Sequence, residues 1–235
     1  CARIEVMKFA QQGFAGGLDC RLRDAPAEKP AHHVVFYQED EYVLDKVAQW
    51  LYRKIESGYS TLIIATEQHR IEITGRLAIM GPAFANAARS GRHLMLDAAG
   101  TLQGFMSNDG PDRERFRATL AAAMAKVGAV GGGAQSLAAY GEMVGLLCDA
   151  GHTASAIQLE QFWNEAIAEF NFSLCCGYAL RQLRGVVEVG PISAICDEHS
   201  ELTFEDDAVR RRDFGVLMGY LRQRTRSLRE PRRAG

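Results

Sequence analysis

The sequence lacks the features that define membrane, disulfide-rich and zinc-finger proteins. No apolar run approaches the roughly 18 residues of a membrane-spanning helix, so we expect no membrane segment. The six cysteines form no CxxC pair, which is typical of reduced thiols and argues against a zinc site of short spacing. The N-terminal residues show no basic start followed by an apolar stretch, so no secretory signal is visible. We therefore expect a cytoplasmic protein.

The sequence also lacks the common catalytic motifs. The phosphate loop GxxxxGK[ST] is absent, and so are GxSxG and HExxH. The adjacent residues His32 and His33 precede an apolar run and would point to opposite faces of a strand, so they cannot both face one metal ion. From these patterns we expect no catalytic residue, no metal site and no cofactor.

Short apolar runs alternate with amphipathic segments along most of the chain. The runs are rich in β-branched and aromatic residues and predict strands, whereas the segments between them have apolar positions at helical spacing. The expected strands are residues 31–38, 60–66, 93–98, 136–143 and 171–178. The expected helices are residues 39–58, 66–81, 102–106, 111–127, 143–151 and 152–170. This alternation predicts an α/β fold with a mostly parallel sheet and helices on both faces.

Both ends of the chain lie outside this pattern. Glycines and prolines interrupt residues 1–30, and after Gly185 the pattern weakens. Residues 186–190 predict an edge strand or a hairpin arm, and residues 192–200 are ambiguous. We expect a long exposed helix at about 205–229. The predicted division is an N-terminal appendage at 1–30, one α/β domain at 31–200, and an arginine-rich helix and tail at 201–235.

The charge of the chain is nearly balanced but unevenly distributed. The net charge is −2, so the protein as a whole lacks the positive charge that is typical of nucleic-acid-binding surfaces. From Val209 onward, however, nine arginines accompany two acids, so the rest of the chain is acidic. This segment is a candidate contact for a partner protein or for nucleic acid, and its leucine seam would allow a homodimer. The arginines expected at such a contact are Arg210, Arg211, Arg212, Arg222 and Arg226.

The turn after the first expected strand is acidic. It contains Glu39, Asp40 and Glu41 and no glycine. A phosphate group placed there would meet negative charge rather than a cradle of backbone N–H groups and a lysine. Ordinary triphosphate binding at this turn is therefore disfavoured.

The carboxyl ends of parallel strands form the edge at which open α/β sheets bind ligands. Glu142 ends an expected strand there, where an acid can contact a ligand, hold Mg²⁺, or simply stabilise a helix N-terminus. Trp163 either lines such a ligand site or is a core side chain. Beside it, Glu160 and Asn164 are expected to cap the backbone of a neighbouring strand. The residues expected to form the wall of a ligand site are His33, Tyr37, Glu39, Glu142 and Trp163.

Several stretches of the chain together resemble a known family. They are HHVVFYQEDEYVLDKVAQWL, STLIIATEQHR, LDAAGTLQGFM, PDRERFR, YGEMVGLLCDAGHTASAIQLEQFWNEA and FSLCCGYAL. In this order they resemble the MEDS domain, the methanogen/methylotroph sensory domain first described in a dichloromethane-responsive repressor. The resemblance runs from about His32 to Leu180. Its most specific parts are YGEMV, the LExxWN pattern and the FSLxCxY strand.

The resemblance implies a RecA/KaiC-like core that has lost its phosphate loop. It also implies a sensory role in bacterial or archaeal signalling, often beside a DNA-binding, histidine-kinase or anti-sigma-factor-like module. Small hydrocarbon derivatives have been suggested as ligands for the family. This chain departs from the pattern at Cys176-Gly177-Tyr178-Ala179, where the family often shows Ala-Tyr-Pro. We also expect the arginine-rich helix in place of a separate output domain.

Three functions agree with these observations. The first is a non-catalytic sensory domain that binds a small molecule or a signalling protein and acts in transcriptional or two-component-type regulation. The second is a divergent nucleotide hydrolase or kinase that uses Glu142. The third is an interaction or nucleic-acid-binding protein that acts through the arginine-rich helix.

Overall fold

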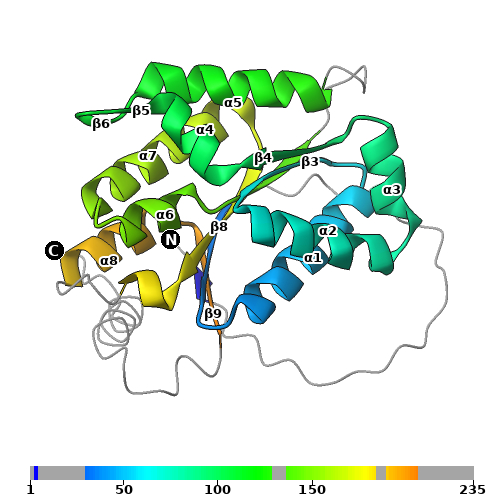
Figure 1. Ribbon diagram of the computed structural model, residues 1–235, viewed down its shortest axis with the longest axis horizontal. Helices are drawn as coiled ribbons and strands as arrows, with labels where there is room; N and C mark the ends of the chain where they lie inside the picture. The colour runs from blue at the N-terminus through cyan, green and yellow to red at the C-terminus, as the bar shows by residue number, and fades with distance from the viewer. Residues whose placement is uncertain (1–2, 5–29, 129–135, 184–188, 206–235) are drawn as a thin grey trace, which may run out of the picture.

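The computed structural model describes residues 3–4, 30–128, 136–183 and 189–205 of the chain. Within these residues, a seven-stranded sheet lies between two layers of helices (Figure 1). The strand order is β1-β9-β2-β8-β7-β3-β4, and every pairing in this sheet is parallel. The predicted α/β fold with helices on both faces of a parallel sheet is confirmed, and it is consistent with a RecA-like core.

The main elements follow the predicted alternation. The strands of the sheet are β1 (Arg3–Ile4), β2 (His32–Tyr37), β3 (Ser60–Ala65), β4 (His93–Asp97), β7 (Leu137–Gly141), β8 (Ser173–Ala179) and β9 (Glu201–Phe204). The helices are α1 (Asp40–Glu56), α2 (Glu67–Met80), α3 (Pro82–Arg89), α4 (Ala98–Phe105), α5 (Arg113–Gly128), α6 (Met143–Asp149), α7 (Thr153–Phe170), the 3₁₀ helix η1 (Leu180–Leu183) and α8 (Val189–Asp197). A separate antiparallel pair is formed by β5 (Met106–Ser107) and β6 (Gly110–Pro111).

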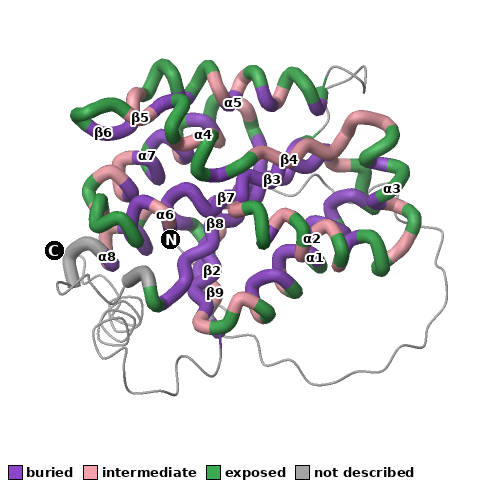
Figure 2. The backbone as a smooth tube through the Cα atoms, viewed as in Figure 1, coloured by how far each residue is buried: buried purple, intermediate pink, exposed green. Residues whose placement is uncertain are grey.

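The sheet separates two hydrophobic cores because successive strand residues point to opposite faces. In β2, Val34 and Phe36 join the core under α4 to α8, whereas Val35 and Tyr37 join the core under α1 to α3. The strands in the middle of the sheet are therefore buried on both faces (Figure 2). This is why their sequences are continuous apolar runs rather than alternating ones.

Helix α1 shows how the local sequence positions the carboxyl edge of the sheet. Val43, Val47, Leu51 and Ile55 recur at helical spacing and are buried. Acidic residues occupy the first turn of the helix, where they favour its N-terminus. The chain leaves α1 through Gly58, whose φ of 86° lies in the left-handed region that glycine tolerates. The acidic turn is therefore also the start of a helix that is anchored on the sheet.

Some elements differ from the sequence-based expectations. Helix α3 was not predicted, and it begins with Pro82 at its first turn. The ambiguous residues 192–200 continue helix α8 as far as Asp197. The described part of the predicted edge strand at 186–190 also belongs to α8, so a strand there is wrong for residues 189 and 190. Most of the predicted C-terminal helix at 205–229 lies outside the described residues.

The sheet extends beyond residues 31–200. Strand β9 pairs with β2, and Glu201 lies opposite His33, while β1 pairs with the outer side of β9. The predicted division of the chain at residues 30 and 200 stays a prediction. Among the described residues, no helix has the length and apolar character needed to cross a membrane.

Candidate functional site

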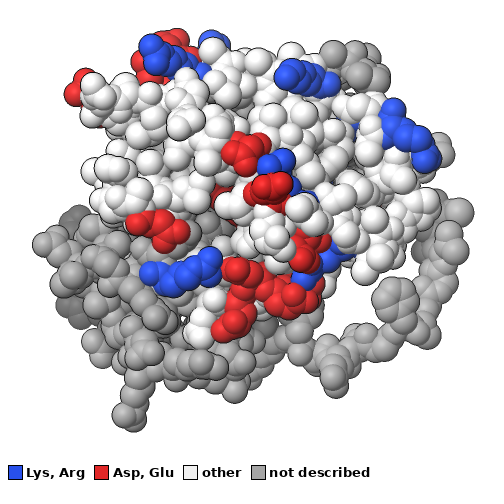
Figure 3. All heavy atoms as spheres, in the orientation of Figure 1, with Lys and Arg blue, Asp and Glu red and all other residues white. Residues whose placement is uncertain are grey.

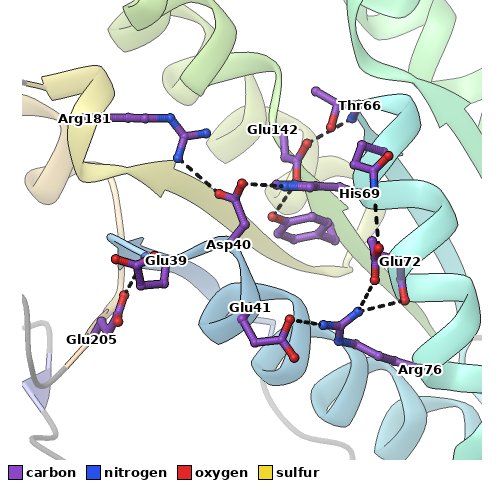
Figure 4. A network of polar contacts seen from close by, with 12 residues as sticks. Glu39, Asp40, Glu41, Thr66, His69, Glu72, Arg76, Glu142, Arg181 and Glu205 are labelled. Atoms are coloured by element: carbon purple, nitrogen blue, oxygen red, sulfur yellow. Dashed lines mark hydrogen bonds and ion pairs between the residues drawn. The ribbon is translucent and has the colours of Figure 1, made fainter.

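A network of charged and polar side chains lies at the carboxyl edge of the sheet (Figure 4). Glu142 is at its centre, directly after β7, and its backbone N–H donates to the carbonyl oxygen of Ile64 at 3.0 Å. This bond continues the pairing of β7 with β3 by one residue. The backbone of Glu142 is therefore fixed at the strand end, and the residue is only 5% exposed.

Both oxygens of the Glu142 carboxylate accept hydrogen bonds. Oε1 lies 2.8 Å from the Tyr140 hydroxyl and 2.5 Å from Nδ1 of His69, and Oε2 accepts the backbone N–H of Thr66 at 2.9 Å. Burial and the charge of Glu142 raise the pKa of Tyr140 well above its usual value, so its hydroxyl stays protonated and donates. The carboxylate is thus satisfied within the protein.

His69 connects Glu142 to the acidic turn. Its Nε2 lies 3.7 Å from Oδ2 of Asp40, whose other oxygen lies 3.1 Å from a guanidinium nitrogen of Arg181. The hydrogen bond to Glu142 raises the pKa of His69, and Asp40 adds to this shift although burial opposes it. When His69 is protonated, two carboxylates and two cations alternate along this chain of contacts, and their charges balance.

The backbone N–H groups of the acidic turn bind a carboxylate from a distant part of the chain. Gln38 N–H and Glu39 N–H both donate to Oε2 of Glu205, at 2.7 and 3.1 Å. In α/β proteins that bind nucleotides, a turn at this position offers its N–H groups to phosphate. Here Glu205, which directly follows β9 and is 9% exposed, takes that place.

The third carboxylate of the turn is also paired. Arg76 on α2 contacts Glu41 at 2.6 Å and Asp45 at 2.8 Å, both on α1, and Glu72 at 2.6 Å on its own helix. The guanidinium thereby links α1 to α2. In the space-filling view, carboxylates and cations mingle across the region where Figure 1 places these two helices (Figure 3).

The structure brings together three of the five residues predicted to line a ligand site. Tyr37, Glu39 and Glu142 lie at the carboxyl edge, with Tyr37 buried and Glu39 exposed. Burial and the charges of Glu142 and Asp40 raise the pKa of Tyr37 above its usual value. Their role in binding a ligand stays a prediction.

The other two predicted residues lie elsewhere. His33 is near the opposite end of β2, where its Nε2 lies 2.7 Å from the Thr203 hydroxyl. There it lines a hollow of about 390 Å³ together with Trp50, Lys54 and Glu201. Trp163 is in the core beneath α7 and packs edge-on against Phe116, with ring centroids 4.8 Å apart. The arginines from 210 to 226 that were expected to contact a partner or nucleic acid lie outside the described residues.

Sequence reasoning did not find Thr66, His69, Arg181 or Glu205. Thr66 and His69 follow β3 and Arg181 follows β8, so the rule that strand ends meet at one edge could have indicated them. Nothing in the local sequence of Glu205 indicates its contact with Gln38, which is 167 positions away.

Stability is expected to depend on pH through His69. Because the folded pKa is raised, the stabilising contribution is complete below the unfolded pKa of about 6.5 and is lost as pH rises through the folded pKa. The test is urea unfolding of the native protein and His69→Gln across this pH range. The stability advantage of the native protein over the variant should shrink as pH rises, and an advantage that grows with pH would contradict the assignment.

Comparison with known proteins agrees with the predicted resemblance. The family model "MEDS: MEthanogen/methylotroph, DcmR Sensory domain" matches residues 31–188. Searches of curated proteins and of solved structures gave no match. The matched range contains β2, the acidic turn, His69, Glu142 and Arg181, and it ends before β9 and Glu205. Since it covers more than half of the chain, the protein belongs to the MEDS family of sensory domains.

Proposed function

We propose that this MEDS domain is a non-catalytic sensor that binds a small molecule or a partner protein and acts in transcriptional or two-component-type regulation. Membership of a sensory family supports a signalling role. The observation that carries the proposal is the Glu205 carboxylate on the N–H groups of Gln38 and Glu39. A turn that is already bonded to a carboxylate of its own chain is unsuited to hold the phosphates of a nucleotide.

Electrostatics supports the same conclusion. A phosphate near the turn would lie beside Asp40 and Glu41 as well as Glu205. At an effective dielectric constant of about 20, two like unit charges 4 Å apart repel each other by about 4 kcal/mol. Arg181 and Arg76 are already paired with Asp40 and Glu41, so they supply little net attraction for a further anion.

The geometry of Glu142 argues against the alternative of a nucleotide hydrolase or kinase. An acid that holds Mg²⁺ or orients water must direct carboxylate lone pairs at the ion or the water, in a place that the substrate can reach. Glu142 is instead buried, and its two oxygens accept three hydrogen bonds from within the protein, from Thr66, His69 and Tyr140. In this arrangement Glu142 joins β7, β3 and α2 and has a positioning role.

The structure suggests how binding at this edge would be transmitted. Glu205 directly follows β9 and precedes the arginine-rich end of the chain. A ligand or partner that displaced Glu205 from the turn would release the end of β9. The two states are the one with Glu205 bonded to the turn and the one with Glu205 displaced. A ligand shifts the equilibrium between them only by the difference in its affinity for the two.

Calorimetry with Mg-ATP and a phosphate-release assay test the non-catalytic assignment. We expect no saturable heat and no phosphate release from either the native protein or Glu142→Gln. We also expect a saturable rise in Tm with at least one member of a panel of small hydrocarbon derivatives that includes dichloromethane. If the native protein released phosphate and Glu142→Gln did not, the non-catalytic assignment would be contradicted and the nucleotide hydrolase or kinase would be favoured.

A further inference from the structure

Four side chains with metal-binding atoms meet inside the protein, on the face of the sheet covered by α7 and α8. They are His32 from β2, Glu160 from α7, Cys176 from β8 and His199, which lies between α8 and β9. All four are buried, with exposed fractions between 0 and 4%. One candidate ligand atom from each residue lies within 4.8 Å of all the others. This cluster is separate from the network around Glu142.

Four distances within the cluster are close to those of a tetrahedral zinc site, and the four ligand atoms all lie within 4.8 Å of one another. His32 Nε2 lies 3.2 Å from Glu160 Oε2 and 3.5 Å from Cys176 Sγ. Cys176 Sγ lies 3.5 Å from Glu160 Oε2, and His199 Nε2 lies 3.5 Å from Glu160 Oε1. Ligands bound tetrahedrally at the usual Zn–N, Zn–O and Zn–S lengths are about 3.3–3.6 Å apart. The contacts among His32, Glu160 and Cys176 already have these lengths, and a central ion would draw His199, which faces the other Glu160 oxygen, toward them.

The orientation of His199 gives independent evidence for a ligand. Its Nδ1 lies 2.7 Å from the carbonyl oxygen of Ile195, and because a carbonyl only accepts, Nδ1 must carry the hydrogen. A neutral ring then presents a lone pair at Nε2. This atom is buried and has no hydrogen-bond partner among the described residues, and its nearest charged neighbour is the Glu160 carboxylate. Two acceptors facing each other repel unless a cation or a proton lies between them.

His32 is oriented in the same way. Its Nδ1 lies 2.8 Å from Asn164 Oδ1 and 3.1 Å from the carbonyl oxygen of Glu198. The Asn164 amide nitrogen donates to Glu198, which leaves the amide oxygen to accept from His32. His32 therefore donates through Nδ1 and directs Nε2 at Glu160 and Cys176. Histidines that bind metals are typically held by such an outer hydrogen bond from the second ring nitrogen.

We propose that His32, Glu160, Cys176 and His199 bind one divalent transition-metal ion, of the class of Zn²⁺, in a tetrahedral site. Two imidazoles, a thiolate and a carboxylate form a donor set suited to zinc. The Tyr178 hydroxyl donates to Glu160 at 2.7 Å and orients the carboxylate. Four protein ligands leave no open position for substrate, so the ion has a structural or regulatory role rather than a catalytic one.

The proposed ion would join parts of the chain that are far apart in sequence. It would bind β2 and β8 to α7 and to the residue two positions before β9. Since β9 leads directly to Glu205, binding of the ion and the position of Glu205 are expected to be linked. The metal site does not depend on the proposed sensory function, because it rests on a different set of contacts.

The test uses the native chain and two cysteine variants. Metal content is measured on protein purified without chelator, and the protein is then stripped and titrated with Co²⁺. We expect one ion per chain, the strong visible bands of tetrahedral Co²⁺, and a near-ultraviolet charge-transfer band from the thiolate. Chelation should lower Tm, and Zn²⁺ should restore it.

Cys175→Ala is the matched control for Cys176→Ala. Both cysteines are buried on β8, but Cys175 belongs to the core on the opposite face of the sheet. Cys176→Ala should lose the charge-transfer band and Cys175→Ala should keep it. A band that survives in Cys176→Ala would overturn the proposed ligand set. Native protein that binds no Co²⁺ and whose Tm is insensitive to chelator would overturn the metal site, and this measurement requires no variant to fold.

Discussion

Replacing Glu142 with alanine is expected to lower the free energy of unfolding by about 3–5 kcal/mol, because it removes a buried carboxylate that accepts three hydrogen bonds. The substitution leaves three donors without their acceptor: Thr66 N–H, the Tyr140 hydroxyl and His69 Nδ1. Glu142→Gln should cost less, about 1–3 kcal/mol, because the amide keeps one accepting oxygen. Urea unfolding of the three proteins at neutral pH measures both effects.

Glu67→Ala is the control for this experiment. Glu67 is an exposed carboxylate in the first turn of α2, two residues from His69, and surface substitutions of this kind change stability by only about 0.5 kcal/mol. If Glu142→Ala proved as mild as Glu67→Ala, the hydrogen bonds at the strand end would not stabilise the fold. Glu142 would then be free for another role.

Gly177→Ala is expected to destabilise the protein by displacing Tyr140, which donates a hydrogen bond to Glu142. A Cβ atom at position 177 would lie 2.5 Å from the Tyr140 hydroxyl oxygen and 3.2 Å from the ring carbon that bears it. Because Tyr140 is fully buried, its ring has little space to move, and overpacking of this kind costs about 1–3 kcal/mol. Displacing the ring also stretches the hydrogen bond to Glu142, which adds to the loss in the free energy of unfolding.

A double-mutant cycle with Tyr140→Phe checks this explanation. Removing the hydroxyl removes the closest contact, so the double variant should be more stable than the sum of the two single effects predicts. Gly75→Ala serves as the control, because position 75 is inside α2 and a Cβ there meets no atom within 4 Å. That change should stabilise the protein by about 0.5–1 kcal/mol through helix propensity. Strictly additive effects in the cycle would contradict a clash between the methyl group and the hydroxyl.

The sequence predicted the architecture because burial on both faces leaves a simple signal. Strands β2, β3 and β8 are continuous apolar runs, and the helices between them have clear stripes, as Val43 to Ile55 show in α1. Strand β9 has only four residues and lies beyond the region of clear alternation, and pairing with β2 makes it a strand. Such a strand is determined by tertiary contacts rather than by its own composition.

Residues at the carboxyl edge of the sheet were predictable only where they directly follow a strand that is recognisable from its sequence. Glu142 and the acidic turn were found by this rule, and both lie at the carboxyl edge. His33 lies near the opposite end of β2, and Trp163 lies in the core against Phe116, because the spacing of apolar residues predicts burial but not which side chains will be neighbours. Their role in binding stays a prediction. Glu205 and the buried cluster were not predicted, since their contacts join β2 to residues from 160 to 205, and no local spacing reports such a pairing.

The bond between Glu205 and the turn also bears on how sensitive the domain is. An incoming group that needs the same two N–H donors must compete with a carboxylate that is tethered to the sheet and never diffuses away. Its apparent affinity equals its intrinsic affinity multiplied by the fraction of time for which the two N–H donors are not bonded to Glu205. The rarer that state is, the weaker the observed binding. If the proposed sensor binds its ligand at this turn, weakening the internal competitor would lower the concentration at which the domain responds, and Glu205 would set the threshold of response.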